Sequence, residues 1–491
     1  MKNEDARIEE SLDPHDWEAL RDLSHRIVDD AIDYVRDVRD RPVWQPMPDK
    51  ALQRFREPLP DGPKAIETVY QTLAEDMLPY PMGNIHPRFW MWYMGSGNFT
   101  GALGDFLAAI LGSNLGGGNH AAALIDQQVV DWFRQIVGFP DGASGTLVSG
   151  GSMANIIGLT VARNAAAGSD VREAGIAALN GHLRYYCSDQ VHSCHQTAME
   201  LLGLGNQALR RIPTGPDCRL DVVALRSAIA EDRAAGFKPA CVIATAGTVN
   251  TGAIDDLLRI ASLCRRENLW FHIDGCIGAL LAIAPQNQHL VEGIELADSL
   301  ALDPHKWLHA PFDVGCALVR DANSHRGTFA LNPEYLETAE RGIANAPWLF
   351  DYGVQTSRGF RALKVWMSLQ EHGVGKFGRL IDQNVMQAAY LCDLVEGNPC
   401  LELWPGRAIN IVCYRYNPGR LTSDALKQIN TEIMLRMQED GSAAVSDTTV
   451  HGEHFLRVAI NNHRTVSDDL EFLVAETVRM GDAIVGQGGT G

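Results

Sequence analysis

The sequence lacks an excess of basic side chains and any long apolar run. Its 42 lysines and arginines are outnumbered by 61 aspartates and glutamates, which gives a formal net charge of -19 at pH 7. Such a charge repels phosphate backbones and anionic lipid surfaces, so we expect no nucleic-acid partner and no membrane partner. No stretch approaches the roughly 18 to 20 apolar residues of a membrane span, so we expect no transmembrane helix.

Paired cysteines are also missing, because the ten cysteines are scattered without a CxxC pair. We interpret them as reduced thiols and expect neither a disulfide framework nor a structural zinc site. The first residues, MKNEDARIEE, are highly charged and contain no apolar signal core, so we expect a cytoplasmic protein. At 491 residues and 46% hydrophobic, the chain is too long for one ordinary domain and too apolar to be disordered.

The apolar pattern divides the chain into three parts. Residues 1–100 contain two helical patterns and a proline-rich connector, which predict an N-terminal helical arm. Between residues 101 and 363, helical patterns alternate with the short apolar runs GTLVS, RYYCSD, ACVIATA, WFHID, DSLAL and GCALVRD. This alternation is typical of an α/β domain with a mostly parallel sheet. Residues 364–491 contain long helical patterns and two strand candidates, AINIVCYRY and HFLRVAI, and we expect a smaller α+β domain.

A lysine interrupts the apolar segment SLALDPHKWLHAPFDVGCALV, in which Lys306 lies between two predicted strands. Burial disfavours the charged ammonium and lowers its pKa, which leaves a nucleophilic amine suited to forming a Schiff base. A lone lysine more often keeps its stem on the core and its ammonium in solvent. The neighbouring motifs must therefore decide between the two interpretations.

A glycine pair precedes a predicted helix in TLVSGGSMANIIG. Gly151 lets backbone N–H groups approach a phosphate at the positive end of the helix, and Ser152 adds a hydroxyl. The same residues also fit a tight turn that Ser152 caps. A serine-hydrolase elbow would need glycine where Ala154 stands. The GLGNQA stretch from Gly203 follows a helix instead of the strand that a dinucleotide-binding motif requires.

Three further motifs lie where predicted strands end. Asp274 closes the strand of WFHIDGC, where a buried carboxylate either caps the turn or needs a partner such as a protonated pyridine nitrogen. His192, in SDQVHSC, could stack on a flat ring or simply begin a helix. His192 and His195 have the spacing of a shared metal site, but no third ligand is evident, so we expect no metal. Thr248, in ATAGTVNTG, offers a hydroxyl at a strand exit.

A phosphate cradle, a carboxylate for a pyridinium, a ring-stacking histidine and a nucleophilic lysine are together the parts that hold pyridoxal phosphate. With these motifs the sequence resembles the group II pyridoxal-phosphate-dependent decarboxylases, the family of aromatic-L-amino-acid and glutamate decarboxylases. The resemblance covers nearly the whole chain and includes HPRFWMWYM, DPHKW and NPEYL. It implies the aspartate-aminotransferase fold (fold type I), with a mostly parallel seven-stranded sheet. It also implies a homodimer whose active sites use residues from both subunits.

The resemblance assigns roles to the residues around the cofactor ring. Lys306 matches the lysine that binds the cofactor covalently, and His305 precedes it as in other members. Asp274 matches the carboxylate that keeps the pyridine nitrogen protonated, and His192 matches the imidazole stacked on the ring. Thr248 is a further candidate for contact with the cofactor.

The remaining matches concern the phosphate and the substrate. Gly151 and Ser152 match the phosphate-binding turn, and Tyr335 in NPEYL matches a mobile-loop tyrosine that donates a proton to the α-carbon of the substrate. Cys276 takes the small-residue position beneath the cofactor. Many relatives have asparagine where Asp303 stands; because a carboxylate close to phosphate is unfavourable, we expect Asp303 to bind backbone or solvent.

Aromatic residues surround the expected substrate pocket. HPRFWMWYM supplies Phe89, Trp90, Trp92 and Tyr93, and we add Phe350 to the same pocket. No cluster of arginine or lysine there suits a side-chain carboxylate, so we expect an aromatic substrate such as tryptophan, tyrosine or dopa. The alternatives are a decarboxylase of glutamate or an aliphatic amino acid, a decarboxylating aldehyde synthase, and a protein that binds the cofactor without turnover.

Overall fold

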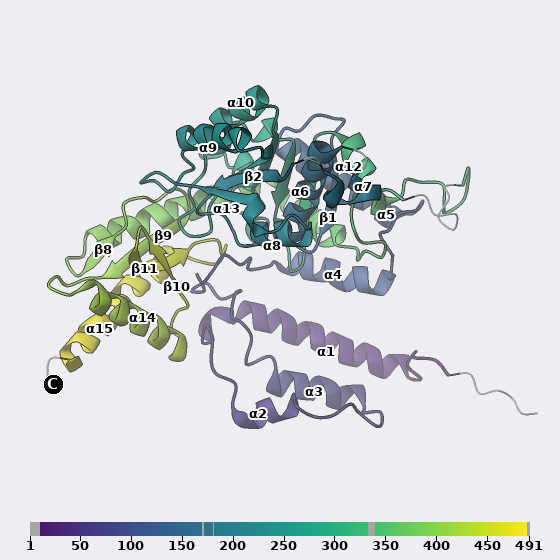
Figure 1. Cartoon of the computed structure of the whole chain (residues 1–491). Coiled ribbons are helices and arrows are strands. Elements are labelled where there is room, and N and C mark those ends of the chain that lie inside the picture. Colours follow the sequence, from purple (N-terminus) through teal and green to yellow (C-terminus); the bar gives the residue numbers. More distant parts are fainter. Residues whose placement is uncertain (1–9, 169–170, 180, 332–338, 489–491) are drawn as a thin grey trace, which may run out of the picture. The chain divides into compact units, whose positions relative to one another are not determined.

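The computed structural model describes residues 10–168, 171–179, 181–331 and 339–488, which belong to two compact units, Met1–Gly83 and Asn84–Gly491. The first unit contains α1 (Trp17–Arg36), α2 (Asp49–Arg54) and α3 (Ile66–Asp76) (Figure 1). The Asp16 carboxylate caps α1, because it accepts hydrogen bonds from two backbone N–H groups of the first turn. The two helical patterns predicted for this region are confirmed as α1 and α3.

A seven-stranded sheet in the order β1-β7-β6-β5-β4-β2-β3 is the centre of the second unit. Its neighbours pair in parallel, except that β7 is antiparallel to both β1 and β6. The strands are β1 (Ser144–Val148), β2 (Leu183–Ser188), β3 (Leu209–Ile212), β4 (Lys238–Thr245), β5 (Trp270–Asp274), β6 (Ser299–Leu302) and β7 (Gly315–Val319). The expected mostly parallel sheet is confirmed, and each of the six apolar runs forms a strand. The seven strands that the resemblance implies are present, and the seventh, β3, is not marked by an apolar run because two arginines interrupt its pattern.

Helices cover both faces of this sheet (Figure 1). The helices of this part are α4 (Phe99–Leu111), α5 (Ala121–Ile136), α6 (Gly151–Ala167), α7 (Val171–Ala174), α8 (Cys194–Leu201), α9 (Val222–Ala234), α10 (Leu257–Glu267), α11 (Pro304–Trp307) and α12 (Ala322–Phe329). Side chains of α5, α9 and α10 share one buried apolar cluster with strand residues, and those of α6 and α8 pack on the other face.

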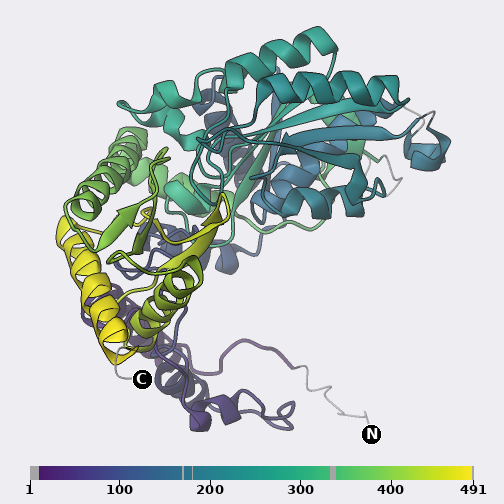
Figure 2. The same ribbon diagram turned by 60° about the vertical axis from the view of Figure 1, so that its left-hand side comes forward.

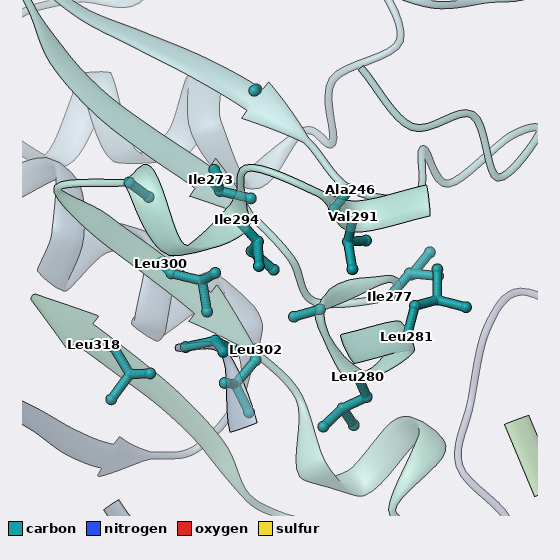
Figure 3. Packing of buried hydrophobic residues seen from close by; sticks show 14 of the residues in the cluster. Ala246, Ile273, Ile277, Leu280, Leu281, Val291, Ile294, Leu300, Leu302 and Leu318 are labelled. Carbon is teal, nitrogen blue, oxygen red and sulfur yellow. The ribbon is translucent and has the colours of Figure 1, made fainter. Parts of the chain in front are cut away.

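At β6 and β7, whose alternate residues point to opposite sides, the two faces of the sheet differ in side-chain size. Figure 3 shows Ile273, Leu300, Leu302 and Leu318 packed together on one face. On the other face, beneath α6, the corresponding positions of β6 and β7 are alanines. A Cβ on Gly158 of α6 would lie 2.7 Å from a carbon of a buried histidine ring. Small residues therefore let α6 lie close to the sheet, with its first turn at the strand ends.

The C-terminal part begins with α13 (Ala362–Glu396), which is interrupted at Gly373. Its antiparallel sheet has the order β10-β11-β9-β8, and α14 and α15 share an apolar cluster with it (Figure 2). The elements are β8 (Leu401–Leu403), β9 (Ile411–Tyr416), β10 (Ser446–Val450), β11 (Glu453–Ala459), α14 (Ser423–Glu439) and α15 (Ser467–Gly488). Both predicted strands are present, as β9 and β11, and the sequence missed the two outer strands.

Two general features bear on function. Within the described ranges, no helix is both long enough and apolar enough to cross a bilayer. All ten cysteines are free thiols, and nine of them are buried.

Candidate active site

A cavity of about 440 Å³ lies at the carboxyl ends of the parallel strands, where open α/β sheets bind their ligands. The turn between β1 and α6, the loops that follow β2, β4, β5 and β6, and a segment preceding α4 all contribute to its wall. The structure brings together at this cavity seven of the eight residues that the sequence assigned to the cofactor: Lys306, Asp274, His192, Gly151, Ser152, His305 and Cys276.

The short helix α11 positions Lys306 directly after β6. The flanking residues anchor this helix, because the Trp307 indole N–H donates to Asn384 Oδ1 at 3.1 Å. On the other side, His305 Nδ1 lies 2.7 Å from the carbonyl oxygen of Val314 and donates to it. The buried neighbours fix the backbone, so that the lysine side chain lies in the wall of the cavity.

Two expectations about Lys306 and its neighbour are wrong. The Lys306 Nζ lies 2.9 Å from Asp303 Oδ2, so this buried carboxylate pairs with the lysine instead of backbone or solvent. Burial by itself lowers the pKa of Lys306, but the charge and hydrogen bond of Asp303 outweigh burial and raise that pKa above its ordinary value. The free amine is therefore held charged. The apolar pattern around Lys306 indicates its burial but not the partner of its ammonium.

Asp274 ends β5 with a buried carboxylate that two groups hold. Its Oδ1 accepts a hydrogen bond from the Cys276 backbone N–H at 3.2 Å, and its Oδ2 lies 2.9 Å from His195 Nε2. Burial alone raises the pKa of Asp274, but the hydrogen bond and charge of His195 lower it far below its usual range. Burial lowers the pKa of His195, whereas its bond to Asp274 raises that pKa, to about 10. Asp274 is thus an anion suited to a cationic ring nitrogen.

His192 lies on the cavity wall, exposed and just before α8. Its Nδ1 accepts a hydrogen bond from the Cys194 backbone N–H at 3.1 Å, and its pKa is raised first by its interaction with Cys194. The sequence suggested His192 and His195 as a possible pair of metal ligands. The structure instead groups His195 with Cys194 and Asp274, whose potential ligand atoms lie within 4.8 Å of one another. Cys194 and Asp274 line the cavity and His195 bonds Asp274, so these three residues are part of the same site.

Gly151 and Ser152 form the first turn of α6, where backbone N–H groups have no acceptor within the helix. A Cβ on Gly151 would lie 2.3 Å from Cys276 Sγ, so only glycine lets this turn approach the strand ends. An anion-binding turn, an ionised carboxylate and a lysine therefore surround one cavity. This set fits pyridoxal phosphate, with the phosphate at the turn, the pyridine nitrogen at Asp274 and the aldehyde at Lys306.

Two candidates do not reach this cavity or cannot be placed. The buried Thr248 uses its hydroxyl inside its own loop, where its oxygen lies 3.0 Å from Thr251 Oγ1 and accepts a hydrogen bond from the Ala253 N–H. Thr245 of the same segment lines the cavity instead. Tyr335 lies outside the described residues.

The aromatic candidates are dispersed. Tyr93 lines the cavity. Trp92 is 48% exposed, and its ring contacts that of Phe89 edge to face. Phe350 stacks on Trp348 in the wall of a separate cavity of about 490 Å³. Trp90, the fourth aromatic residue of the motif, is buried in the apolar cluster of the C-terminal part. Within the described chain, Tyr93 is thus the candidate that the structure brings to Lys306.

A polar chain that the sequence did not predict lies beneath the cavity. Asn155 of α6 directs its amide nitrogen toward Cys194 Sγ at 3.7 Å and Cys276 Sγ at 3.8 Å. Its Oδ1 lies 2.8 Å from His272 Nε2, and His272 Nδ1 lies 2.8 Å from Ser299 Oγ. The available signal was a polar residue inside an apolar pattern, in MANIIG and in WFHID.

Known proteins resemble this chain in sequence and in fold. The family model described as "Pyridoxal-dependent decarboxylase conserved domain" matches residues 48–417. The chain is 34% identical to an aromatic-L-amino-acid decarboxylase of Bacillus atrophaeus, over 92% of this chain and 93% of that protein. It superimposes on Oryza sativa TDC, solved with PLP and tryptamine, with a TM-score of 0.89 at 27% identity, covering 96% and 100% of the two chains. Rhodiola rosea 4-hydroxyphenylacetaldehyde synthase gives 0.85 at 25% identity, covering 96% and 100%.

Fold and site together define a pyridoxal-phosphate-dependent enzyme of fold type I. More specifically, the chain belongs to the pyridoxal-dependent decarboxylase family and is an amino acid decarboxylase with pyridoxal phosphate as its cofactor. The family, the fold, the cofactor and the reaction class that the motifs implied are confirmed.

The pairing of Lys306 with Asp303 makes cofactor attachment depend on pH. Replacing Asp303 with asparagine removes the charge that raises the lysine pKa, so more of the amine is neutral at a given pH. We expect Asp303→Asn apoenzyme to attach the cofactor about tenfold faster near neutral pH, with the rise in rate moved to lower pH. Stopped-flow absorbance after mixing with pyridoxal phosphate measures this rate.

The control is Asp105→Asn, which removes the carboxylate that lies 2.9 Å from a second buried lysine, Lys364. This change leaves the cavity intact and should leave the pH profile unchanged. Identical profiles for wild type and Asp303→Asn would show that Asp303 does not hold the proton on Lys306.

Proposed function

We propose that this decarboxylase acts on an aromatic L-amino acid and releases CO₂ and the corresponding amine. The observation that carries the substrate class is the buried Tyr93 ring, whose centre lies 5.9 Å from Lys306 Nζ in the cavity wall. A flat apolar wall beside the reacting amine favours a planar side chain. The relative named an aromatic-L-amino-acid decarboxylase, and the rice enzyme solved with tryptamine, support this class.

Five residues at the cavity have assigned roles in the proposed reaction. When bound, pyridoxal phosphate supplies an electron sink for the pair that CO₂ leaves behind. Lys306 provides the amine that holds the aldehyde carbon. Asp274, held ionised, keeps a proton on the ring nitrogen. His192, on the exposed wall, covers the ring, while Gly151 and Ser152 bind the phosphate through N–H and hydroxyl groups.

We assign the protonation of the α-carbon to Tyr335. This role rests on the match of NPEYL to the corresponding family motif, because the residue lies outside the described part of the chain. A phenol carries a proton at neutral pH and can donate it to a carbon from which CO₂ has departed.

The apolar face of α4 supports a homodimer. The small face of this helix packs against α13, where a Cβ on Gly104 would lie 2.8 Å from Lys364 Cα. The opposite face carries large apolar side chains at helical spacing, each at least 38% exposed: Leu103, Phe106, Leu107, Ile110 and Leu111. Such a stripe is typical of a protein interface. We propose that a second copy covers it and that the two copies share their active sites.

We place the enzyme in the cytoplasm. Its ten free thiols suit a reducing compartment, where cysteines stay unpaired.

The substrate class is tested with purified, cofactor-loaded enzyme. Tryptophan, tyrosine, dopa, glutamate and leucine are supplied one at a time, and CO₂ and amine are measured. We expect kcat/KM to be at least about tenfold higher for an aromatic substrate, because glutamate and leucine lack the ring that the Tyr93 wall favours.

The control is Lys306→Ala, which should show no turnover and no covalent cofactor after borohydride reduction. The best rate with glutamate or leucine would replace the aromatic assignment. Absence of product from every amino acid would instead favour a protein that binds the cofactor without turnover.

Removing only the Tyr335 hydroxyl tests the proton donor. We expect Tyr335→Phe to lower amine formation about 100-fold or more, with little change in KM. Because the electron pair at the α-carbon then persists, we expect reaction with O₂ and water to give aldehyde, CO₂, ammonia and hydrogen peroxide. Amine, peroxide and oxygen uptake are measured in parallel.

Tyr390→Phe is the matched control, since this hydroxyl bonds Glu471 on the surface. A wild-type rate of amine formation in Tyr335→Phe would contradict the assignment. Peroxide from the wild type itself would identify an aldehyde synthase.

Charged substitutions on the exposed apolar stripe of α4 test whether this helix forms the dimer interface. Phe106→Glu combined with Ile110→Glu places two charges on the exposed stripe without touching its packed face, so we expect a monomer in analytical ultracentrifugation. Leu435→Glu, at an exposed apolar position of α14, should remain dimeric. Monomeric wild type, or an unchanged dimer of the double variant, would contradict this interface.

A further inference from the structure

His195 is a fully buried histidine behind Asp274 and is not one of the groups that the motifs assign to the cofactor. It lies in the first turn of α8, and its Nε2 is 2.9 Å from Asp274 Oδ2. The other carboxylate oxygen accepts the Cys276 backbone N–H. A side chain and a backbone group therefore hold Asp274 from both oxygens, which leaves the carboxylate little freedom to rotate.

One nitrogen of His195, Nε2, faces the Asp274 carboxylate. Its Nδ1 has no hydrogen-bond partner among the described residues, although the ring is fully buried. Burying a polar nitrogen without a partner is unfavourable, so packing alone would favour an apolar side chain at this place. The contacts that distinguish histidine here from an apolar residue are those to Asp274 and to the Cys194 side chain, and the one to Asp274 is a 2.9 Å hydrogen bond.

His272 is also fully buried and differs in its bonding. Its ring centre is 6.2 Å from that of His195, but its two nitrogens face Ser299 and Asn155. Burial, helped by the charge of His195, lowers the pKa of His272 to about 3. His272 is therefore neutral and does not compete for Asp274. The other ionisable groups that act on Asp274 or His195 are Cys194, Cys276 and Lys306.

We propose that His195 is a positioning residue for the cofactor, which donates from Nε2 to Asp274 and holds that carboxylate ionised and in one orientation toward the pyridine nitrogen. This inference rests on the proposed role of Asp274. His195 acts through Asp274 and has no contact of its own with the reacting atoms. Partners that orient a functional side chain in this way commonly contribute 10–100-fold, roughly, to affinity or activity.

Two substitutions of His195 distinguish its hydrogen bond to Asp274 from its packing. His195→Leu removes the donor, and His195→Gln retains an N–H near the position of Nε2. We expect the leucine variant to lose about 10–100-fold in kcat and to bind pyridoxal phosphate more weakly, with KM little changed. The glutamine variant should recover most of both losses. Tryptophan fluorescence of the apoenzyme, titrated with pyridoxal phosphate, gives the cofactor Kd independently of turnover.

The matched control is His325→Leu. This imidazole is equally buried but bonds Ser144 and the Tyr352 carbonyl, outside the cavity. Its loss should lower the Tm and leave kcat and cofactor Kd unchanged. Equal values for His195→Gln and His195→Leu would overturn the donor role.

A double-mutant cycle gives the decisive comparison. In an Asp274→Ala background the carboxylate is gone, so adding His195→Leu should not change the cofactor Kd further. The same loss of affinity in both backgrounds would show that His195 only packs. Stoichiometric zinc in wild-type apoenzyme that is lost in His195→Gln would also overturn the proposal, because His195 would then be a metal ligand. Inactive wild type refutes the proposed function, whereas an active wild type matched by His195→Leu refutes this inference alone.

Discussion

The active site depends on neutralising two carboxylates that are both buried at the carboxyl end of the sheet. Asp274 ends β5 and Asp303 follows β6, and they are 6% and 3% exposed. Two uncompensated anions beside a phosphate site would be strongly unfavourable. Each therefore has its own nitrogen partner at 2.9 Å, His195 for Asp274 and Lys306 for Asp303. The arrangement of the surrounding elements serves to bring these pairs together.

The size difference between the two faces of β6 and β7 makes this possible. Large side chains on the α9 and α10 side supply the apolar cluster that stabilises the strands, while small residues on the α6 side allow that helix to lie close. The close approach brings the glycine turn of α6 next to Cys276 and Asp303. One helix end thus supplies N–H groups for an anion within the same cavity as the paired carboxylates.

Much of the fold and part of the site could be predicted, because both follow from local patterns. Apolar runs located six strands of the large sheet, and carboxyl ends of parallel strands meet at one edge, so Lys306 and Asp274 were expected to lie together. The predictions that were wrong concern which side chains contact each other. His195 was paired with His192 by helical spacing, but α8 begins at Cys194, so His192 lies outside the helix on the exposed wall. The partner of Asp303 lies three residues away, on a helix too short to give a periodic signal.

The two carboxylates differ in whether the charge of their partner changes during cofactor attachment. Lys306 is partly exposed to the cavity and must give up a proton to bond an aldehyde, so the charge facing Asp303 changes during cofactor attachment. His195 is fully buried, and its Nε2 lies 2.9 Å from Asp274, so the charge facing Asp274 stays in place. A fixed anion suits a ring nitrogen that must remain protonated throughout, whereas an exchangeable pair suits an amine that must react. Similar burial of the two aspartates therefore supports two different kinds of chemistry.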